Sequence, residues 1–247
     1  MKTQALFDET PYERTFDARV IAVSGQGVAL DRTLFYPTGG GQPGDIGYLT
    51  LADGTRVMVL DSQRDGTDRS LIWHQVNADS AARIQSDMTL QGDIDWARRY
   101  AHMKMHTCLH LLCSILDAPV TGCGIGHEKG RLDFDIPEMQ LDKATITQAL
   151  NGLIRSGREV MTQMMDASDY ATALAITRTA SVAPPVMQGM VRVIEIPDVD
   201  RQPCGGTHVR SLEEIGEVVC DKIEKKSQHN RRVTIRFVLE SVIHPLI

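Results

Sequence analysis

The sequence has no apolar run long enough to cross a membrane, and its N-terminus lacks the hydrophobic core of a signal peptide. We therefore expect a cytoplasmic protein without a membrane partner. The five cysteines are odd in number and irregularly spaced, so a disulfide framework is not expected and the thiols can serve packing or metal binding. Internal repeats and low-complexity stretches are absent as well.

The 247 residues also lack a basic excess, since the formal net charge is -6. This balance argues against a protein that coats nucleic acid indiscriminately, and no DNA partner is expected. Basic residues nevertheless cluster at 98–99 and at 222–232. Each cluster is compatible with a solvated surface or with a local grip on an RNA end.

Short β-branched runs dominate the first ninety or so residues. The segments "ARVIAVSGQGVALDRTLFYP" (18–37) and "GYLTLADGTRVMVLDSQRDGT" (47–67) each hold two such runs around a turn, and "SLIWHQV" (70–76) is a further strand candidate. Several short strands at this spacing predict a small barrel or sandwich.

A helical period begins near Asp95. Within "DIDWARRYAHMKMHTCLHLLCSILDA" the apolar residues Met105, Leu109, Leu112 and Leu116 recur on one helix face. A second helix is expected at 142–157. The remaining apolar runs predict strands at 130–136, 191–196, 217–223 and 231–240, the last two joined as a hairpin.

These patterns predict an α+β protein of two domains. Residues 1–92 are expected to form a small β-barrel-like domain with a glycine-rich loop. Residues 93–247 are expected to form a two-layer α/β domain with an antiparallel sheet.

Three histidines recur at every fourth position of the first helix: His102, His106 and His110. At about 100° per residue, neighbours in this row lie about 40° apart, so either adjacent pair faces one way. The segment "QPCGGTHVR" places Cys204 and His208 in a loop, because a proline and two glycines disfavour a regular element. Two imidazoles from the helix, with a thiolate and an imidazole from the loop, make a ligand set suited to tetrahedral Zn²⁺.

The two motifs "HTCLHLL" and "CGGTH", in this order and about a hundred residues apart, resemble the editing domain of alanyl-tRNA synthetase. That domain also occurs in free-standing trans-editing proteins of the AlaX type and, in related form, in threonyl-tRNA synthetase. Three further segments resemble the same family: "LFYPTGGGQPGDIGYL", "GIGHEKGRLDFDIPE" and "EIGEVVCDKIEKKSQHNRRVTIRFVL". The resemblance extends from about Asp31 to Leu239.

The resemblance implies one Zn²⁺ per chain, held by His106, His110, Cys204 and His208. It implies an aminoacyl-tRNA deacylase, a zinc-dependent ester hydrolase. The bond cleaved joins a wrongly attached serine, or glycine in some members, to the acceptor end of tRNA(Ala). No class II synthetase core accompanies the β-rich domain, so a stand-alone trans-editing protein is expected.

The remaining site residues are candidates only, and the catalytic ones are not identified. Four residues surround the expected position of a metal-bound water: Thr107, Gly205, Gly206 and Thr207. The backbone N–H groups around Gly205 and Gly206 suit an oxyanion, and the hydroxyls of Thr107 and Thr207 suit the substrate or the metal ligands. The candidates for substrate binding are Thr38, Gly39, Gly40, Gly41, Gln42 and Cys123. The candidates for tRNA phosphate contacts are Arg98, Arg99, Lys225, Lys226, Arg231 and Arg232.

Two other functions are compatible with the same motifs. One is a non-catalytic tRNA-binding or protein-binding module in which zinc is structural. The other is a zinc hydrolase of small esters or amides, which would act without regard to tRNA. The sequence leaves open whether zinc activates water or only organises the site.

Overall fold

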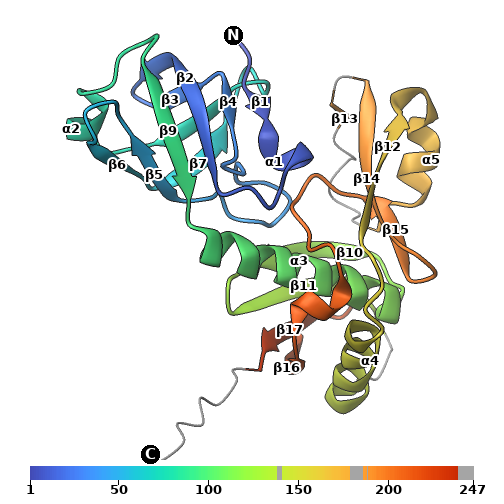
Figure 1. Cartoon of the computed structure of the whole chain (residues 1–247). Helices are drawn as coiled ribbons and strands as arrows, with labels where there is room; N and C mark the ends of the chain where they lie inside the picture. The colour runs from blue at the N-terminus through green and yellow to red at the C-terminus, as the bar shows by residue number, and fades with distance from the viewer. Residues whose placement is uncertain (138–140, 179–185, 188, 239–247) are drawn as a thin grey trace, which may run out of the picture. The chain divides into compact units, whose positions relative to one another are not determined.

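A computed structural model describes residues 1–137, 141–178, 186–187 and 189–238 (Figure 1). The chain divides into two compact units. The first unit consists of Met1–His106, Ile125–His127 and Cys204–His208. The second consists of Thr107–Gly124, Glu128–Pro203 and Val209–Ile247.

The first unit is built on a seven-stranded antiparallel sheet in the order β6-β5-β9-β2-β3-β8-β7. Its strands are β2 (Thr15–Ser24), β3 (Gly27–Leu30), β5 (Gly47–Thr50), β6 (Arg56–Val59), β7 (Asp61–Arg64), β8 (Ile72–Gln75) and β9 (Thr89–Ile94). The short elements beside it are β1 (Gln4–Ala5), β4 (Arg32–Thr33), α1 (Leu6–Glu9) and α2 (Ala78–Ala81), with β1 and β4 paired in parallel.

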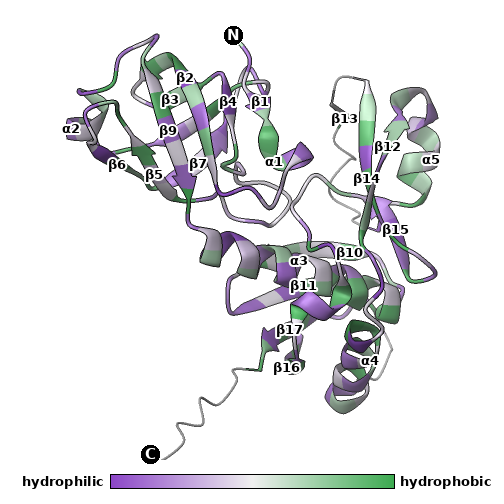
Figure 2. Cartoon of the chain, viewed as in Figure 1, coloured by the Kyte–Doolittle hydropathy of each residue, from purple (hydrophilic) through white to green (hydrophobic). Residues whose placement is uncertain are grey.

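Alternation of apolar and polar residues decides which face of this sheet is buried. In β2 the side chains of Phe16, Ala18 and Val20 are buried while their neighbours are exposed, and β6 buries Val57 and Val59 in the same way. Figure 2 shows this alternation as changes between hydrophobic and hydrophilic colour along the strands. These residues belong to one hydrophobic core cluster of the unit.

Helix α3 (Trp96–Leu116) follows β9 and is the longest helix of the described residues. Its predicted apolar stripe is confirmed, since Met105, Leu109, Leu112 and Leu116 are all buried. The helix is continuous across the boundary between the two units, which falls after His106. Its geometry therefore relates the histidines on either side of that boundary.

The glycine-rich loop (residues 38–42) is held at both flanks by the first turn of α3. Arg99 is fully buried; its Nε donates to Asp45 Oδ2 at 2.7 Å and its Nη2 donates to the carbonyl oxygen of Leu34. Arg98 Nη1 donates to the carbonyl oxygen of Gly44 at 2.6 Å. These contacts tie the segments before and after the loop to the helix that carries the histidines.

Removing one partner of the buried Arg99–Asp45 ion pair should destabilise the fold strongly. Substituting Arg99→Met leaves the Asp45 carboxylate, which is 1% exposed, without its cationic partner. We expect the free energy of unfolding to fall by about 3–5 kcal/mol, measured by urea denaturation. The matched control is Arg19→Met, which breaks the exposed Arg19–Asp87 pair and should cost at most about 1 kcal/mol. Equal losses in the two variants would contradict this account.

The second unit contains two antiparallel sheets. One has the strand order β10-β11-β17-β16, and the other has β12-β14-β13 with β15 paired to β14. Their strands are β10 (Val120–Ile125), β11 (Lys129–Asp135), β12 (Met161–Asp166), β13 (Val186–Met187), β14 (Met190–Ile196), β15 (Asp200–Pro203), β16 (Val218–Lys225) and β17 (Asn230–Phe237). The helices are α4 (Lys143–Arg155), α5 (Tyr170–Ala175) and the 3₁₀ turns η1 (Ala167–Asp169) and η2 (Leu212–Ile215).

Helix α4 is joined to β16 by one buried side chain. Asn151 Nδ2 donates to the Val218 carbonyl oxygen at 2.8 Å, and Asn151 Oδ1 accepts from the Val218 amide at 3.0 Å. The apolar face of α4 buries Ile146, Leu150 and Ile154. The amphipathic pattern that predicts this helix therefore also predicts the face on which it packs.

The predicted mixed α/β architecture with antiparallel sheets is confirmed. Both predicted hairpins of the first ninety residues and the helices at 93–118 and 142–157 are present, each with slightly shorter bounds. Strands β9, β10, β12 and β15 are present as well, although they were not predicted from the sequence. The last two residues of the strand expected at 231–240 lie outside the described residues.

The strand pairing does not confirm the predicted barrel-like form of the N-terminal domain. Among the described residues the seven-stranded sheet starts at β6 and ends at β7, and no pairing closes it into a barrel. The division into domains 1–92 and 93–247 stays a prediction. No helix in the described ranges combines the length and the apolarity that crossing a bilayer requires.

Candidate metal centre

Helix α3 presents His106 and His110 one turn apart. Residues four apart lie on one helix face, and both side chains are buried among the apolar residues of that face, at 6% and 5% exposure. His102 lies one further turn before them. The helix thus supplies a sheltered pair of imidazoles, which is the environment in which neutral histidine binds a metal.

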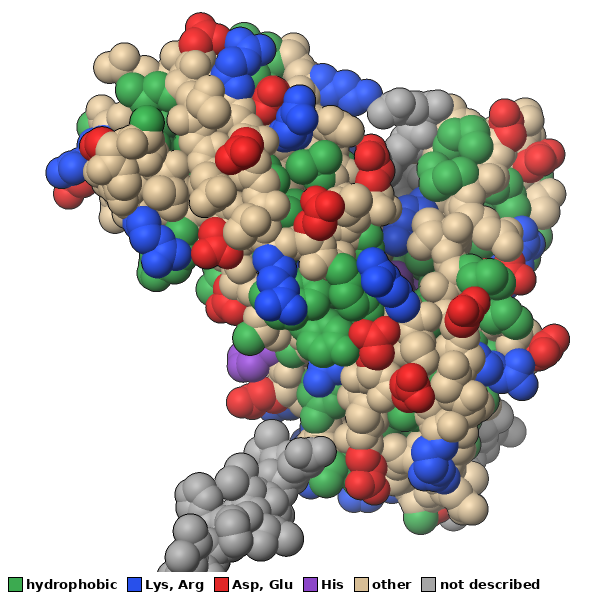
Figure 3. All heavy atoms as spheres, viewed as in Figure 1, with side chains coloured by type: hydrophobic (Ala, Val, Ile, Leu, Met, Phe, Trp, Pro, Cys, Tyr) green, Lys and Arg blue, Asp and Glu red, His purple; other side chains and the backbone are tan. Residues whose placement is uncertain are grey.

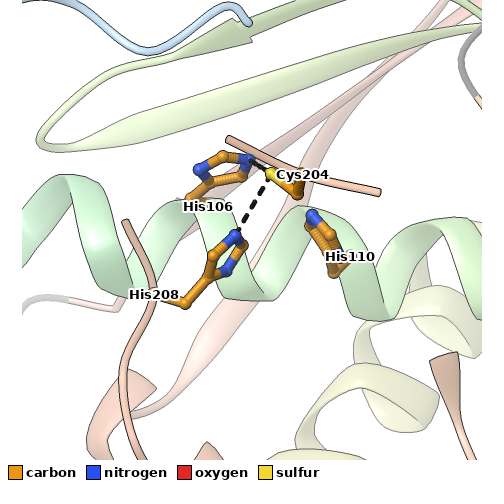
Figure 4. A group of neighbouring side chains, drawn as sticks. All are labelled: His106, His110, Cys204 and His208. Atoms are coloured by element: carbon orange, nitrogen blue, oxygen red, sulfur yellow. Dashed lines mark hydrogen bonds between the residues drawn. The ribbon is translucent and has the colours of Figure 1, made fainter. Parts of the chain in front are cut away.

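The loop after β15 supplies two more donor atoms. Cys204 Sγ lies 3.4 Å from His106 Nε2 and 3.3 Å from His208 Nε2, and the rings of His106 and His208 are 4.2 Å apart between centroids. Figure 4 shows the loop residues facing the two histidines of α3. One ligand atom from each of His106, His110, Cys204 and His208 lies within 4.8 Å of all the others.

This geometry fits a tetrahedral zinc ion. With zinc–ligand bonds of about 2.0–2.3 Å, the ligand atoms of a tetrahedral site are about 3.5 Å from one another. The two sulfur–nitrogen distances are close to that value. Three imidazole nitrogens and one thiolate are also the borderline-soft donors that zinc prefers. The four residues that the family resemblance names are therefore brought together, as a group that can hold a metal ion.

His110 is oriented by a carboxylate that sequence reasoning missed. Its Nδ1 donates to Asp200 Oδ2 at 2.9 Å, and Gln202 Nε2 donates to the same oxygen at 2.8 Å. Arg178 Nε lies 3.3 Å from Asp200 Oδ1. Because Nδ1 of His110 holds the proton, the lone pair on Nε2 is available to a metal.

Asp200 is ionised in this setting. Burial of the carboxyl acts to raise its pKa, but the hydrogen bonds from His110 and Gln202 and the charge of Arg178 outweigh burial and hold the pKa below its usual range. No local pattern in the sequence singles out this residue. In β15 the buried positions alternate, so Asp200 and Gln202 share one face of the strand that leads into the ligand loop.

Gly206 is required by a close approach to His106. A Cβ atom at this position would lie 2.1 Å from His106 Cε1 and 2.5 Å from His106 Nδ1. Such distances are far below van der Waals contact, so any side chain would displace the ring from the metal centre. The second glycine of the loop therefore serves the packing of a ligand.

A methyl group at Gly206 should abolish tight zinc binding. We expect Gly206→Ala to lower the affinity for Zn²⁺ by at least tenfold, measured by competition with a chromophoric chelator. Gly152→Ala is the control, because that position in α4 has no atom within 4 Å of the new Cβ and alanine favours a helix. If Gly206→Ala binds zinc as tightly as Gly152→Ala, the close approach of Gly206 to His106 is not required for zinc binding.

Neutralising Asp200 should weaken the metal site without unfolding it. Asp200→Asn keeps an acceptor for His110 but removes the charge, and loss of such a partner typically costs 10–100-fold in metal affinity. The matched control is Asp198→Asn, two residues away, whose side chain is 85% exposed. Zinc titration should give a lower affinity for Asp200→Asn than for Asp198→Asn, whereas the circular dichroism spectra of the two variants should be the same. Equal zinc affinities would contradict the role given to Asp200.

His102 is not part of the group of four. It is 1% exposed, and its pKa is lowered to about 4, first by burial and then by the charges of Arg98, His127 and Arg99. It is therefore neutral at physiological pH. Cys108, between the two ligands of the helix, is completely buried, and burial raises the pKa of its thiol to about 12, as expected of a packing residue.

The two threonines beside the ligands bond to protein groups. Thr107 Oγ1 accepts from the Val209 amide at 3.3 Å, and Thr207 Oγ1 accepts from Gln42 Nε2 at 2.9 Å. The Gly206 amide donates to Cys204 Sγ at 3.4 Å. These contacts favour the orientation of metal ligands over direct catalysis for Thr107, Thr207 and Gly206.

Several predicted substrate residues line one cavity of the first unit, of about 520 Å³. Its lining consists of Thr38, Gly39, Gly41, Gln42, Pro43, Leu60, Asp61 and Arg98. Gly40 and Gly41 adopt left-handed conformations with φ of 58° and 82°, which glycine tolerates best. Cys123 lies in β10, is half-buried, and does not line this cavity.

The predicted phosphate contacts differ in their surroundings. Arg98 lines the cavity, whereas the burial of Arg99 favours a structural role for that residue. Lys225 at the end of β16 and Lys226 just after it are exposed, and Lys225 is paired in register with Arg231 of β17. Arg231 donates to backbone carbonyls, and Arg232 Nε donates to Asp133 at 2.7 Å.

Comparison with known proteins places this site in a class. Residues 191–234 match the model of the threonyl and alanyl tRNA synthetase second additional domain, and residues 1–98 match a model of class II (A) tRNA synthetases. These matches relate both parts of the chain to domains of tRNA synthetases.

Whole-chain similarity identifies the family. The chain is 32% identical to the alanyl-tRNA editing protein AlaX-M of Saccharolobus solfataricus, covering 94% of this chain and 97% of that protein. It is 33% identical to AlaX-M of Methanosarcina barkeri, over 96% and 99% of the two chains. It is 32% identical to alanine–tRNA ligase of Pyrobaculum arsenaticum, over 99% of this chain but 28% of the ligase. The chain belongs to the AlaX-M family of alanyl-tRNA editing proteins.

Proposed function

We propose that this protein removes wrongly attached serine from tRNA(Ala), and that glycine is a second amino acid it removes. Editing by this family is aminoacyl-tRNA deacylation, so the chain is a hydrolase and tRNA(Ala) is its substrate class. The observation that carries the proposal is the convergence of His106, His110, Cys204 and His208 in a chain of this family.

The proposed cofactor is a single Zn²⁺ held by those four residues. When bound, such an ion polarises a carbonyl oxygen or makes a water molecule more acidic. Cys204 presents its sulfur to two imidazoles, and the Gly206 N–H stabilises the thiolate by donating to it. We assign the oxyanion contact of the ester to the backbone N–H of Gly205, since no Cβ obstructs its approach.

The cavity beside the glycine-rich loop is proposed to take the aminoacyl-adenosine end of the tRNA. Its volume lies within the usual range for small-ligand sites. Asp61 and Arg98 place one carboxylate and one guanidinium in its lining, which complement the α-ammonium group and a phosphate of that ligand. Gln42 links the cavity to the metal centre, because it lines the one and contacts His106 in the other.

Thr38 is the proposed contact for the serine hydroxyl. Its own hydroxyl lies 3.3 Å from Asp61 Oδ1 as donor and accepts from the Gly44 amide at 2.8 Å. A hydroxyl has two acceptor lone pairs, so one remains for the substrate. Correctly attached alanine has no hydroxyl to make this bond, so the serine ester gains a contact that the alanine ester lacks.

The protein is proposed to bind the tRNA only at its acceptor end. Figure 3 shows Lys and Arg side chains interspersed with Asp and Glu on the face in view, without a continuous basic surface. The exposed pair Lys225 and Lys226 and the cavity residue Arg98 are the proposed phosphate contacts. Such contacts position the ligand and carry no sequence information.

The deacylation assay tests the reaction and its specificity. Zinc-loaded protein is incubated with Ser-tRNA(Ala), Gly-tRNA(Ala) and Ala-tRNA(Ala), and loss of the labelled amino acid is followed. We expect the serine ester to be cleaved at least tenfold faster than the alanine ester. Hydrolysis of small amino-acid esters at the same rate, without regard to tRNA, would instead identify a general esterase.

Substituting Cys204→Ala should remove both zinc and deacylation, because it deletes the thiolate at the centre of the group. Cys220→Ala is the control, since that thiol is buried in β16 and lies outside the group. Metal content is measured by mass spectrometry on the same samples. A wild-type protein with bound zinc but no activity on any mischarged tRNA would favour the structural-zinc module, which a four-ligand set also suits.

A further inference from the structure

Gln42, at the end of the glycine-rich loop, makes three buried contacts with the metal centre. Its Oε1 lies 3.1 Å from His106 Nδ1 and 3.2 Å from the Thr207 amide nitrogen. Its Nε2 lies 2.9 Å from Thr207 Oγ1. The side chain is 1% exposed, so water does not compete for these atoms. Gln42 therefore contacts one ligand directly and the ligand loop twice.

The backbone N–H of Thr207 fixes which end of the amide faces His106. A backbone N–H can only donate, so the atom beside it must be the carbonyl oxygen of Gln42 and not the NH₂ group. The same oxygen lies beside His106 Nδ1. Because a carbonyl oxygen only accepts, Nδ1 of His106 must carry the proton.

This assignment determines what His106 offers to a metal. With the proton on Nδ1, the lone pair of the neutral imidazole is on Nε2, the atom that lies 3.4 Å from Cys204 Sγ. The opposite tautomer would turn an N–H toward the metal centre and could not bind an ion there. Gln42 thus plays for His106 the part that Asp200 plays for His110, with a neutral amide in place of a carboxylate.

The loop holds Gln42 firmly enough for this task. The Gly39 amide donates to the Gln42 carbonyl oxygen at 3.0 Å, and the Gln42 amide donates to the Gly39 carbonyl oxygen at 2.9 Å. The Ile125 amide donates to the Gly41 carbonyl oxygen at 2.9 Å. The loop is thereby closed on itself and tied to a second segment of the same unit.

We propose that Gln42 is a positioning residue of the metal centre, which sets the tautomer of His106 and the place of the Cys204–His208 loop. This role is new for a residue expected from the sequence to bind substrate, and it rests on the proposed zinc site. It makes the glycine-rich loop part of the metal site and not only a wall of the substrate cavity.

The test compares three variants by zinc affinity. Gln42→Leu removes both polar atoms at similar volume and should weaken Zn²⁺ binding by about 10–100-fold, the usual effect of losing the partner of a ligating histidine. Gln42→Glu retains an acceptor for His106 Nδ1 and the Thr207 amide and should restore affinity to within about threefold of wild type. Gln26→Leu, at an exposed turn position, is the matched control and should bind as wild type.

A second measurement reads the tautomer without metal. Long-range ¹H–¹⁵N correlation spectra of the zinc-free protein should show His106 protonated at Nδ1 in wild type and in Gln42→Glu. In Gln42→Leu the proton should move in part to Nε2. A residue that only supported the fold would lower stability without changing this pattern or being rescued by glutamate.

The outcomes separate the inference from the function on which it rests. If wild type binds zinc and Gln42→Leu binds it as tightly as Gln26→Leu, or if the tautomer is the same in all variants, the role given to Gln42 is wrong. If wild type binds no zinc, the proposed cofactor is wrong, and the tautomer spectra alone decide whether Gln42 orients His106.

Discussion

Three imidazoles can face one metal ion only if each keeps its proton on the nitrogen that points away. For two of them the protein supplies an acceptor that enforces this, Gln42 for His106 and Asp200 for His110. The two acceptors arrive from segments far apart in the chain, the glycine-rich loop and β15. Both segments must therefore lie where Gln42 and Asp200 can accept hydrogen bonds from histidines of the same four-residue group.

The glycine-rich loop is placed by charge as well as by backbone hydrogen bonds. Arg98 and Arg99, at the start of α3, bind Gly44, Asp45 and Leu34 on either side of it. Two turns further along the same helix lies His106. A single helix thus fixes both the ligand and the loop that orients the ligand, which explains why Arg99, which looks like a surface cation in the sequence, is buried.

The secondary structure was predictable wherever local periodicity is strong. The helix with the Met105–Leu116 stripe and the hairpin over β5 and β6 follow from patterns of 3.6 and 2 residues. Histidines four apart share a helix face and "CGGTH" predicts a loop, so a metal-binding group was predictable, but the choice of His106 and His110 over His102 came from the family resemblance. The roles of Asp200, Gln202 and Gln42 were not, since a hydrogen bond between residues 64 or 90 positions apart leaves no local pattern.

The sequence by itself determined the family and the helix face that presents two of the candidate metal ligands, because these depend on residue types and short spacings. Only the tertiary structure decided which nitrogen of His106 and of His110 is available, why Gly206 cannot carry a side chain, and that Arg99 is buried. Those properties arise from atoms that meet only after folding, where burial excludes water and each polar group must find its partner within the protein.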